Sequence, residues 1–163
     1  MYKKIIGLVI LVGLIGILPF STPKPATYTT DTLWEVLENT RITYKYSADN
    51  RKFVPEINAG QNVFNYHNTY VTFKAFKVNP TETNGKLVLT SHPSDVCATC
   101  ADHGIQTQIC IEPDTAFLRQ FQLLPVKAYV SVSGYFMLNQ NNKYVFSLTK
   151  ARINNIISIN NDK

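Results

Sequence analysis

The chain has 163 residues and a formal net charge of +5, and 17% of its residues are charged. Nine tyrosines and nine phenylalanines favour strands over helices, and the length suits one domain with its own core. The charge falls to +3 once the two charges of Lys3 and Lys4 are removed with a leader. Because no basic cluster remains in the body, the composition argues against a nucleic-acid partner.

The N-terminus has the layout of a targeting segment. Lys3 and Lys4 precede an apolar run, Ile5–Phe20, that contains no charge. A helix of this length spans about 24 Å, which is less than the roughly 30 Å of a membrane core. Since no pair of small residues marks a cleavage site, residues 1–22 are interpreted either as a signal peptide or as an N-terminal membrane anchor. Both alternatives place the body outside the cytoplasm, as a periplasmic or membrane-anchored protein.

A Pro/Thr-rich stretch at residues 23–30 is predicted to be a tether between this segment and the body. Asp31 is placed to cap a following helix over Thr32–Glu38. Three apolar residues recur at helical spacing in this helix, which predicts that one of its faces docks on the body. They are Leu33, Trp34 and Leu37, and Trp34 is predicted to be a core anchor.

Alternation of apolar and polar residues predicts a half-buried strand over residues 41–46. Phe53–Ile57 contains Pro55 and is predicted to be a short strand at a sheet edge. Thr69–Val78 has apolar residues on both sides, which predicts a strand that is covered on both faces. Lys86–Thr90 is its expected hairpin partner and leads into the cysteine-rich stretch. The residues assigned to the covered side of the first strand are Ile42, Tyr44 and Tyr46.

A strand is also predicted after the cysteine-rich stretch, at Gln106–Glu112. Its alternation places Ile109 and Ile111 on the core side and Cys110 on the opposite side. Residues 114–124 are then predicted to form a short helix or irregular turn. Phe117, Leu118, Phe121 and Leu124 recur there at helical spacing.

The clearest strand pattern is Lys127–Leu138, where Gly134 predicts a bulge or a sharp bend. A last strand follows at residues 144–148, and residues 154–163 are predicted to be a disordered polar tail. Residues 31–153 are therefore expected to form a small OB-like antiparallel barrel, mainly β, with a sandwich as the second choice. One helix is expected at the N-terminus and one short helix before the last hairpin.

Four stretches share their pattern with a known group of proteins. They are Val-x-Phe-x-Ala-Phe at 71–76, Leu-Val-Leu-Thr at 87–90, Cys-x-x-Cys at 97–100 and the closing hairpin at 128–148. Through them the segment from about Thr40 to Ile153 resembles a family of exported bacterial OB-like domains of unknown function, with Cys-x-x-Cys after a central strand. The resemblance implies the fold and the compartment, and it implies no catalytic residue.

The stretch from His92 to Cys110 holds all three cysteines. Exported cysteines are usually oxidised, which predicts a structural disulfide. A bond between Cys97 and Cys100 would close a tight loop. A bond between Cys100 and Cys110 would clamp two neighbouring segments and contribute roughly 3 kcal/mol. The spacing leaves the pairing open, and one cysteine stays unpaired in either case.

A metal site is the alternative interpretation of this stretch. Cys97, Cys100 and Cys110, with His103 and also His92 close in sequence, supply the soft donors of a tetrahedral zinc site, and they would also suit Cu(I). A third interpretation is thiol–disulfide exchange by the pair Cys97 and Cys100.

No motif in the sequence predicts a catalytic residue or an organic cofactor. We expect a non-catalytic exported envelope protein, a binding or assembly module whose cysteine-rich loop is stabilised by a disulfide. Its expected partner is another envelope protein, and the N-terminal segment, if it is not cleaved, would hold the chain at the membrane. Seven tyrosines could form a ligand-binding barrel face or could pack between strands. They are Tyr44, Tyr46, Tyr66, Tyr70, Tyr129, Tyr135 and Tyr144.

Overall fold

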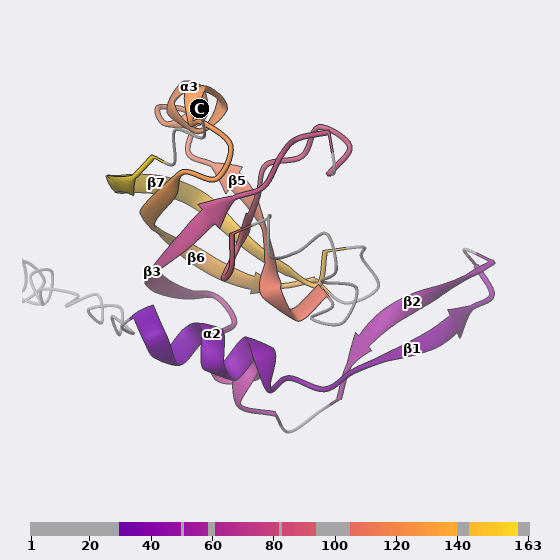
Figure 1. The fold of residues 1–163 in the computed structure, drawn as a ribbon. Coiled ribbons are helices and arrows are strands. Elements are labelled where there is room, and N and C mark those ends of the chain that lie inside the picture. Colours follow the sequence, from indigo (N-terminus) through magenta and orange to yellow (C-terminus); the bar gives the residue numbers. More distant parts are fainter. Residues whose placement is uncertain are drawn as a thin grey trace, which may run out of the picture.

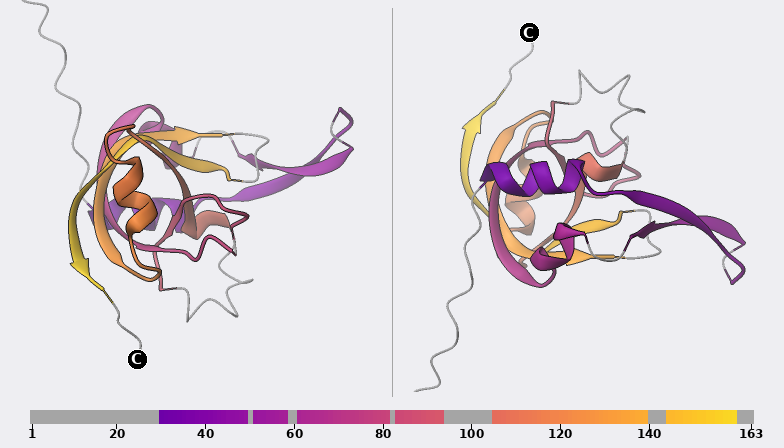
Figure 2. Two further views of the ribbon diagram at one scale, coloured as in Figure 1. Left: turned by 90° about the horizontal axis from the view of Figure 1, so that it is seen from above. Right: turned by 90° about the horizontal axis from the view of Figure 1, so that it is seen from below.

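A computed structural model describes residues 30–49, 51–58, 61–81, 83–93, 105–139 and 144–159. Within these ranges the chain forms a closed five-stranded barrel and a separate two-stranded hairpin (Figure 1). One helix lies over each end of the barrel (Figure 2). The expected N-terminal segment and tether, residues 1–29, lie outside the described residues.

The barrel strands are hydrogen-bonded around the barrel in the order β3-β4-β5-β7-β6, and β6 closes on β3. Four of these pairings are antiparallel, whereas β5 and β7 run parallel. The predicted mainly β, OB-like fold class is confirmed, and closure of the barrel excludes the sandwich. The strands are β3 (Thr69–Lys77), β4 (Val88–Thr90), β5 (Gln108–Pro113), β6 (Tyr129–Leu138) and β7 (Phe146–Ser158).

Alternate residues of the barrel strands fill the core, as the period of two requires. Phe73, Phe136 and Phe146 are fully buried at its centre, and burial of each such side chain stabilises the fold by about 1.5–3 kcal/mol. The prediction that β3 is covered on both faces is wrong. Lys74 is exposed and Phe76 is only half-buried, because these residues point to the outside of the barrel, where one face of the sheet meets solvent.

Gly134 lies where the register between β6 and β7 shifts. A Cβ added there would lie 2.8 Å from Leu148 Cγ and 2.8 Å from the Thr149 carbonyl oxygen. Only glycine therefore allows β7 to cross β6 so closely, and the predicted irregularity at this position is confirmed. β7 itself continues to Ser158, beyond the expected start of the polar tail at Asn154, because it stays paired with β6.

Helix α2 (Thr30–Glu38) closes one end of the barrel. Its residues Leu33, Trp34 and Leu37 belong to the main core. The Trp34 ring meets Phe73 edge-to-face at 5.4 Å between centroids, and its Nε1 donates a hydrogen bond to the Lys74 carbonyl oxygen at 2.8 Å. The predicted role of Trp34 as a core anchor is confirmed.

Helix α3 (Leu118–Leu123) closes the opposite end. Lys77 ties it to the barrel, since the ammonium group donates to the carbonyl oxygens of Phe121, Gln122 and Leu124 at 3.1, 3.3 and 2.5 Å. A cation at a helix C-terminus is stabilised by the helix dipole, while burial lowers the pKa of Lys77.

Leu118 departs from the predicted buried side of this helix. Phe121 and Leu124 are buried as expected, but Leu118 is 43% exposed. The physical reason is the turn of about 100° per residue. With Phe117 and Phe121 directed at the core, Leu118 faces sideways.

The remaining strands, β1 (Ile42–Ser47) and β2 (Lys52–Ile57), form a sheet of their own. This hairpin projects from the α2 end of the molecule, away from the barrel (Figures 1 and 2). A short 3-10 helix, η1 (Asn62–Tyr66), follows the hairpin. Another, η3 (Ile105–Thr107), directly precedes β5. The edge position predicted for Pro55 is confirmed, since β2 pairs with β1 alone.

Candidate interaction site

The projecting hairpin carries three aromatic rings on one side. Its register places Tyr44 opposite Pro55 and Tyr46 opposite Phe53, and directly opposite residues share a side of the sheet. Tyr44 is 60% exposed, Tyr46 55% and Phe53 68%. The rings of Tyr46 and Phe53 meet edge-to-face at 5.5 Å. We call these three residues, Tyr44, Tyr46 and Phe53, the aromatic face of the hairpin.

The prediction that Tyr44 and Tyr46 lie on a covered side is wrong. The base of the hairpin joins the main core, where Ile57 is buried and Ile42 packs against the main cluster, and Val54 in the middle of β2 is also buried. Beyond the base, β1 pairs with β2 alone and does not join the barrel. The alternation in residues 41–46 therefore predicted a strand correctly but not the covering of its apolar side.

Gln61 fixes the base of the hairpin. Its Oε1 accepts a hydrogen bond from the Arg41 backbone N–H at 2.6 Å, and its Nε2 donates to the carbonyl oxygens of Arg41 at 2.9 Å and Asn58 at 3.2 Å. One side chain thus joins Arg41, just before β1, to Asn58, just after β2. Thr40 extends this anchor to α2, because its hydroxyl donates to the Val36 carbonyl oxygen at 2.7 Å.

Exposed cations lie along the whole hairpin, and strand alternation places Lys45 and Lys52 on the side of the sheet opposite the aromatic face. Arg41, Lys45, Arg51 and Lys52 outnumber the acidic residues of the hairpin, Asp49 and Glu56, by four to two. Tyrosine, phenylalanine and arginine are enriched at protein interfaces. The hairpin therefore suits a partner with an apolar contact surface and a net negative charge.

Two residues of the cysteine-rich stretch, His92 and Gln106, lie near the hairpin base, whereas its last residue, Cys110, lies in β5. Cys97, Cys100 and His103 lie outside the described residues. The ends of the stretch are described, and the Ser91 N–H donates to the Thr107 carbonyl oxygen at 3.3 Å. Gln106 Nε2 donates to the carbonyl oxygen of Thr40 at 3.0 Å, next to the first residue of the hairpin.

His92 lies at the same place, exposed on the surface. Its Nδ1 is 2.7 Å from the Ser91 hydroxyl and 3.9 Å from Glu38 Oε1 at the end of α2. Two of the contacts of this ring are therefore with a hydroxyl and a carboxylate. They do not bring His92 together with Cys110, the one predicted cysteine ligand that the structure describes.

Cys110 points away from the main core, as predicted. Ile109 and Ile111 belong to the main cluster, whereas Cys110 packs against a smaller one of Val78, Val88 and Tyr144. Burial raises the pKa of its thiol, and a protonated thiol is a weak nucleophile. Within the described ranges Cys110 has no disulfide partner.

The metal and membrane expectations rest on parts of the chain outside these ranges. Among the described residues, no three His, Cys, Asp or Glu side chains are grouped so that they could hold a metal ion. Three of the five predicted ligands are not described, so the zinc or copper site stays a prediction. No helix in the described part of the chain is long and apolar enough to cross a membrane, and the apolar run at residues 5–20 is not part of it.

No protein-family model, curated protein or solved structure matches this chain. The resemblance to exported OB-like domains therefore stays a prediction. The sequence interpretation named Tyr44 and Tyr46 as members of a possible ligand-binding barrel face, but it missed their exposure beside Phe53 on a hairpin outside the barrel. Its signal lies in the residue types, because tyrosine occupies positions 44 and 46 of β1, whereas the inner positions 130 and 132 of β6 carry valine. Tyrosine tolerates both an apolar and a wet environment.

Proposed function

We propose that this chain is a non-catalytic exported envelope protein, a binding or assembly module that contacts a protein partner through the aromatic face of its hairpin. The observation that carries the proposal is the exposure of Tyr44, Tyr46 and Phe53 on one side of a projecting hairpin. An exposed aromatic strand side favours aggregation unless a partner covers it. Because the chain is predicted to be exported, we expect its partner to be another protein of the cell envelope.

The shape of the hairpin supports this role. Each aromatic side chain can bury about 150–250 Å² against a partner, and aromatic anchors dominate the binding energy of protein interfaces. The hydrogen bonds of Gln61 hold both ends of the hairpin. A preorganised contact surface loses less conformational entropy on binding than a flexible one, so the fixed base favours a tight complex.

The cysteine-rich loop has a supporting role in this proposal. It leaves the body next to the hairpin base, where Gln106 bonds to Thr40, and a disulfide within it would stiffen the same region. Burial raises the pKa of the half-buried Cys110 thiol, which makes this cysteine itself a weak nucleophile, while the exchange interpretation concerns the pair Cys97 and Cys100. The metal-binding alternative has Cys97, Cys100, Cys110 and His103 as ligands. It predicts that the purified chain has the mass of the fully reduced protein with one bound zinc or copper ion.

Site-specific photo-cross-linking in the cells that produce the protein tests the proposed function. Tyr46 is replaced by p-benzoylphenylalanine, and the control replaces Leu123, an exposed apolar residue at the opposite end of the barrel. We expect an adduct with a defined envelope protein from position 46 that is absent from position 123. A Phe53→Ser change in the same chain should abolish it. Adducts of equal yield from both positions, or from neither, would contradict the proposal.

A further inference from the structure

A second group of aromatic and cationic side chains lies on the outer surface of the barrel, across β3, β6 and β7. The register places Tyr70 opposite Tyr135, and Phe76 opposite Tyr129. It also places Arg152 of β7 opposite Ser133 of β6. We call this surface the tyrosine face and define it by Tyr70, Phe76, Tyr129, Tyr135, Lys150 and Arg152.

One end of the tyrosine face is hollowed. Tyr70, Tyr135, Lys150 and Arg152 line a cavity of about 370 Å³. The two tyrosine rings meet edge-to-face at 5.3 Å, and the Lys150 ammonium lies 5.9 Å from the centroid of the Tyr135 ring. This end therefore combines two aromatic walls with two cations, and Tyr135 and Lys150 are exposed to solvent.

A bulge in β7 places Lys150 in this hollow. Strand β5 pairs Glu112 with Thr149 and Pro113 with Ala151, so that Lys150 is left out of the ladder. Its φ is +49°, a left-handed conformation that is costly for a residue with a Cβ. Bulges redirect side chains, and this one accompanies the close crossing of β6 and β7 at Gly134. The fold therefore maintains an unfavourable backbone conformation at the residue that brings a cation to Tyr135.

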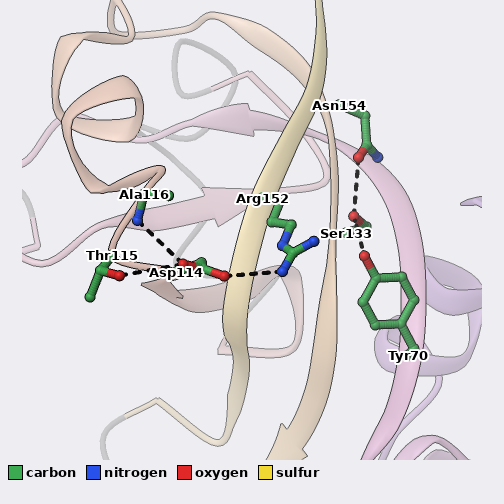
Figure 3. A network of polar contacts seen from close by, with 7 residues as sticks. All are labelled: Tyr70, Asp114, Thr115, Ala116, Ser133, Arg152 and Asn154. Carbon is green, nitrogen blue, oxygen red and sulfur yellow. Dashed lines mark hydrogen bonds and ion pairs between the residues drawn. The ribbon is translucent and has the colours of Figure 1, made fainter.

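Polar side chains form a row across the strands next to the hollow. The Tyr70 hydroxyl lies 2.9 Å from Ser133 Oγ, which donates to Asn154 Oδ1 at 3.1 Å. Figure 3 shows this row beside Arg152, whose guanidinium donates to Asp114 Oδ2 at 3.1 Å on the other side. The Ala116 backbone N–H and Arg152 hold the pKa of Asp114 below its usual value. Since Asp114 offsets much of the charge of Arg152, Lys150 is the main cation for a ligand.

The other end of the tyrosine face is a second aromatic platform. Phe76 and Tyr129 stack at 4.4 Å between centroids, with 23° between their planes. Along β3 this platform lies six positions beyond Tyr70, or about 20 Å in an extended strand. Two aromatic platforms at this spacing, separated by hydroxyl and amide groups, suit a linear ligand.

We propose that the tyrosine face binds a strand of acidic polysaccharide. Sugar rings offer apolar C–H faces to the aromatic platforms at both ends and hydroxyl groups to the exposed Asn154 amide between them, which the buried Ser133 hydroxyl holds in place. A sugar carboxylate meets the ammonium group of Lys150. A nucleic-acid strand fits less well, because it requires a continuous basic groove along its phosphates. The inference uses residues outside the hairpin, so it does not depend on the protein partner proposed above.

Isothermal titration calorimetry with the full chain in mild detergent tests this inference. The probes are tetragalacturonate and the neutral cellotetraose. We expect the acidic probe to bind about tenfold more tightly or better at low salt, with a loss of affinity at high salt because exposed charges are screened. Tyr135→Ser and Lys150→Gln should each weaken tetragalacturonate binding about tenfold, and both replaced side chains are exposed. Matched changes on the hairpin, Tyr44→Ser and Lys45→Gln, should leave it unchanged.

The length of the site is tested with Tyr129→Ser at the distant platform. This change should weaken binding of tetragalacturonate and leave binding of digalacturonate unaltered, because the shorter probe reaches only the hollow. Equal binding of the acidic and neutral probes, or equal losses in the hairpin variants, would overturn the inference. Tighter binding of an oligothymidine than of tetragalacturonate at the same ionic strength would overturn the ligand class.

Discussion

Strands β6 and β1 share the same alternation of apolar and polar residues but differ in what covers them. In β6, Val130, Val132 and Phe136 are fully buried, because β3 and β7 flank the strand and the barrel closes over its inner side. In β1, Tyr44 and Tyr46 alternate in the same way and remain more than half exposed. Alternation thus specifies a strand, whereas pairing with distant segments decides which side is covered.

This difference separates two tasks within one chain. The barrel buries its aliphatic and phenylalanine side chains and provides the stability of the fold. The hairpin leaves aromatic rings in water, where they add little stability. Changes in the barrel core should therefore lower the free energy of unfolding. Changes on the aromatic face of the hairpin should instead lower the affinity for the partner and leave the free energy of unfolding nearly unaltered.

The largest expected effect is the loss of a barrel phenylalanine. Phe73→Ala leaves a cavity at the centre of the core and should lower the free energy of unfolding by about 3–5 kcal/mol. Phe53→Ala, the same chemical change on the hairpin, should alter it by less than about 0.5 kcal/mol. Urea denaturation of the full chain measures both values. Similar losses at the two positions would mean that the hairpin is part of the folded core.

The cysteine-rich loop next to the hairpin base should contribute through a disulfide. We expect the chain purified from an oxidising compartment to have a native mass about 2 Da below that of the reduced chain, with no bound metal. Reduction should lower the free energy of unfolding by roughly 3 kcal/mol if Cys100 and Cys110 are the pair. A fully reduced mass with one zinc or copper ion, lost on denaturation, would replace this interpretation with the metal site.

A backbone change within the barrel should have a smaller effect. Gly134→Ala places a methyl group 2.8 Å from Leu148 and Thr149, which should cost about 1–3 kcal/mol. Gly85, where an added Cβ meets nothing within 4 Å, offers the control. Its φ is +76°, so Gly85→Asn should be tolerated. Equal thermal unfolding of the two variants would show that β6 and β7 can separate at the bulge.

The smallest expected effect is a loss of stability at alkaline pH through Cys110 and Tyr144. Burial raises the pKa of both groups in the folded chain above the ordinary values of 9.0 and 10.0. The unfolded chain therefore loses these protons first, so the free energy of unfolding falls as pH rises past 9.0 and through the folded pKa. In reducing buffer, Cys110→Ala should make this fall shallower. Equal slopes in the variant and the original chain would contradict the assignment.

Local patterns predicted several features of the barrel from the sequence. Trp34 as an anchor, the irregularity at Gly134 and the orientation of Cys110 follow from residue type and spacing, and the structure confirms them. The parallel pairing of β5 with β7 and the exposure of Leu118 were not predictable in this way. They depend on which distant segments meet, as does the separation of the hairpin from the barrel.

The central claim is that the aromatic face of the hairpin binds the protein partner while the buried core of the barrel provides the stability of the fold. The most direct test is the affinity of the cross-linked partner for a chain that carries Tyr44→Ser, Tyr46→Ser and Phe53→Ser together, with thermal unfolding measured on the same sample. We predict a loss of affinity of about tenfold or more and an unchanged unfolding temperature. Unaltered affinity, or a fall in the unfolding temperature that accompanies the loss of binding, would contradict the account.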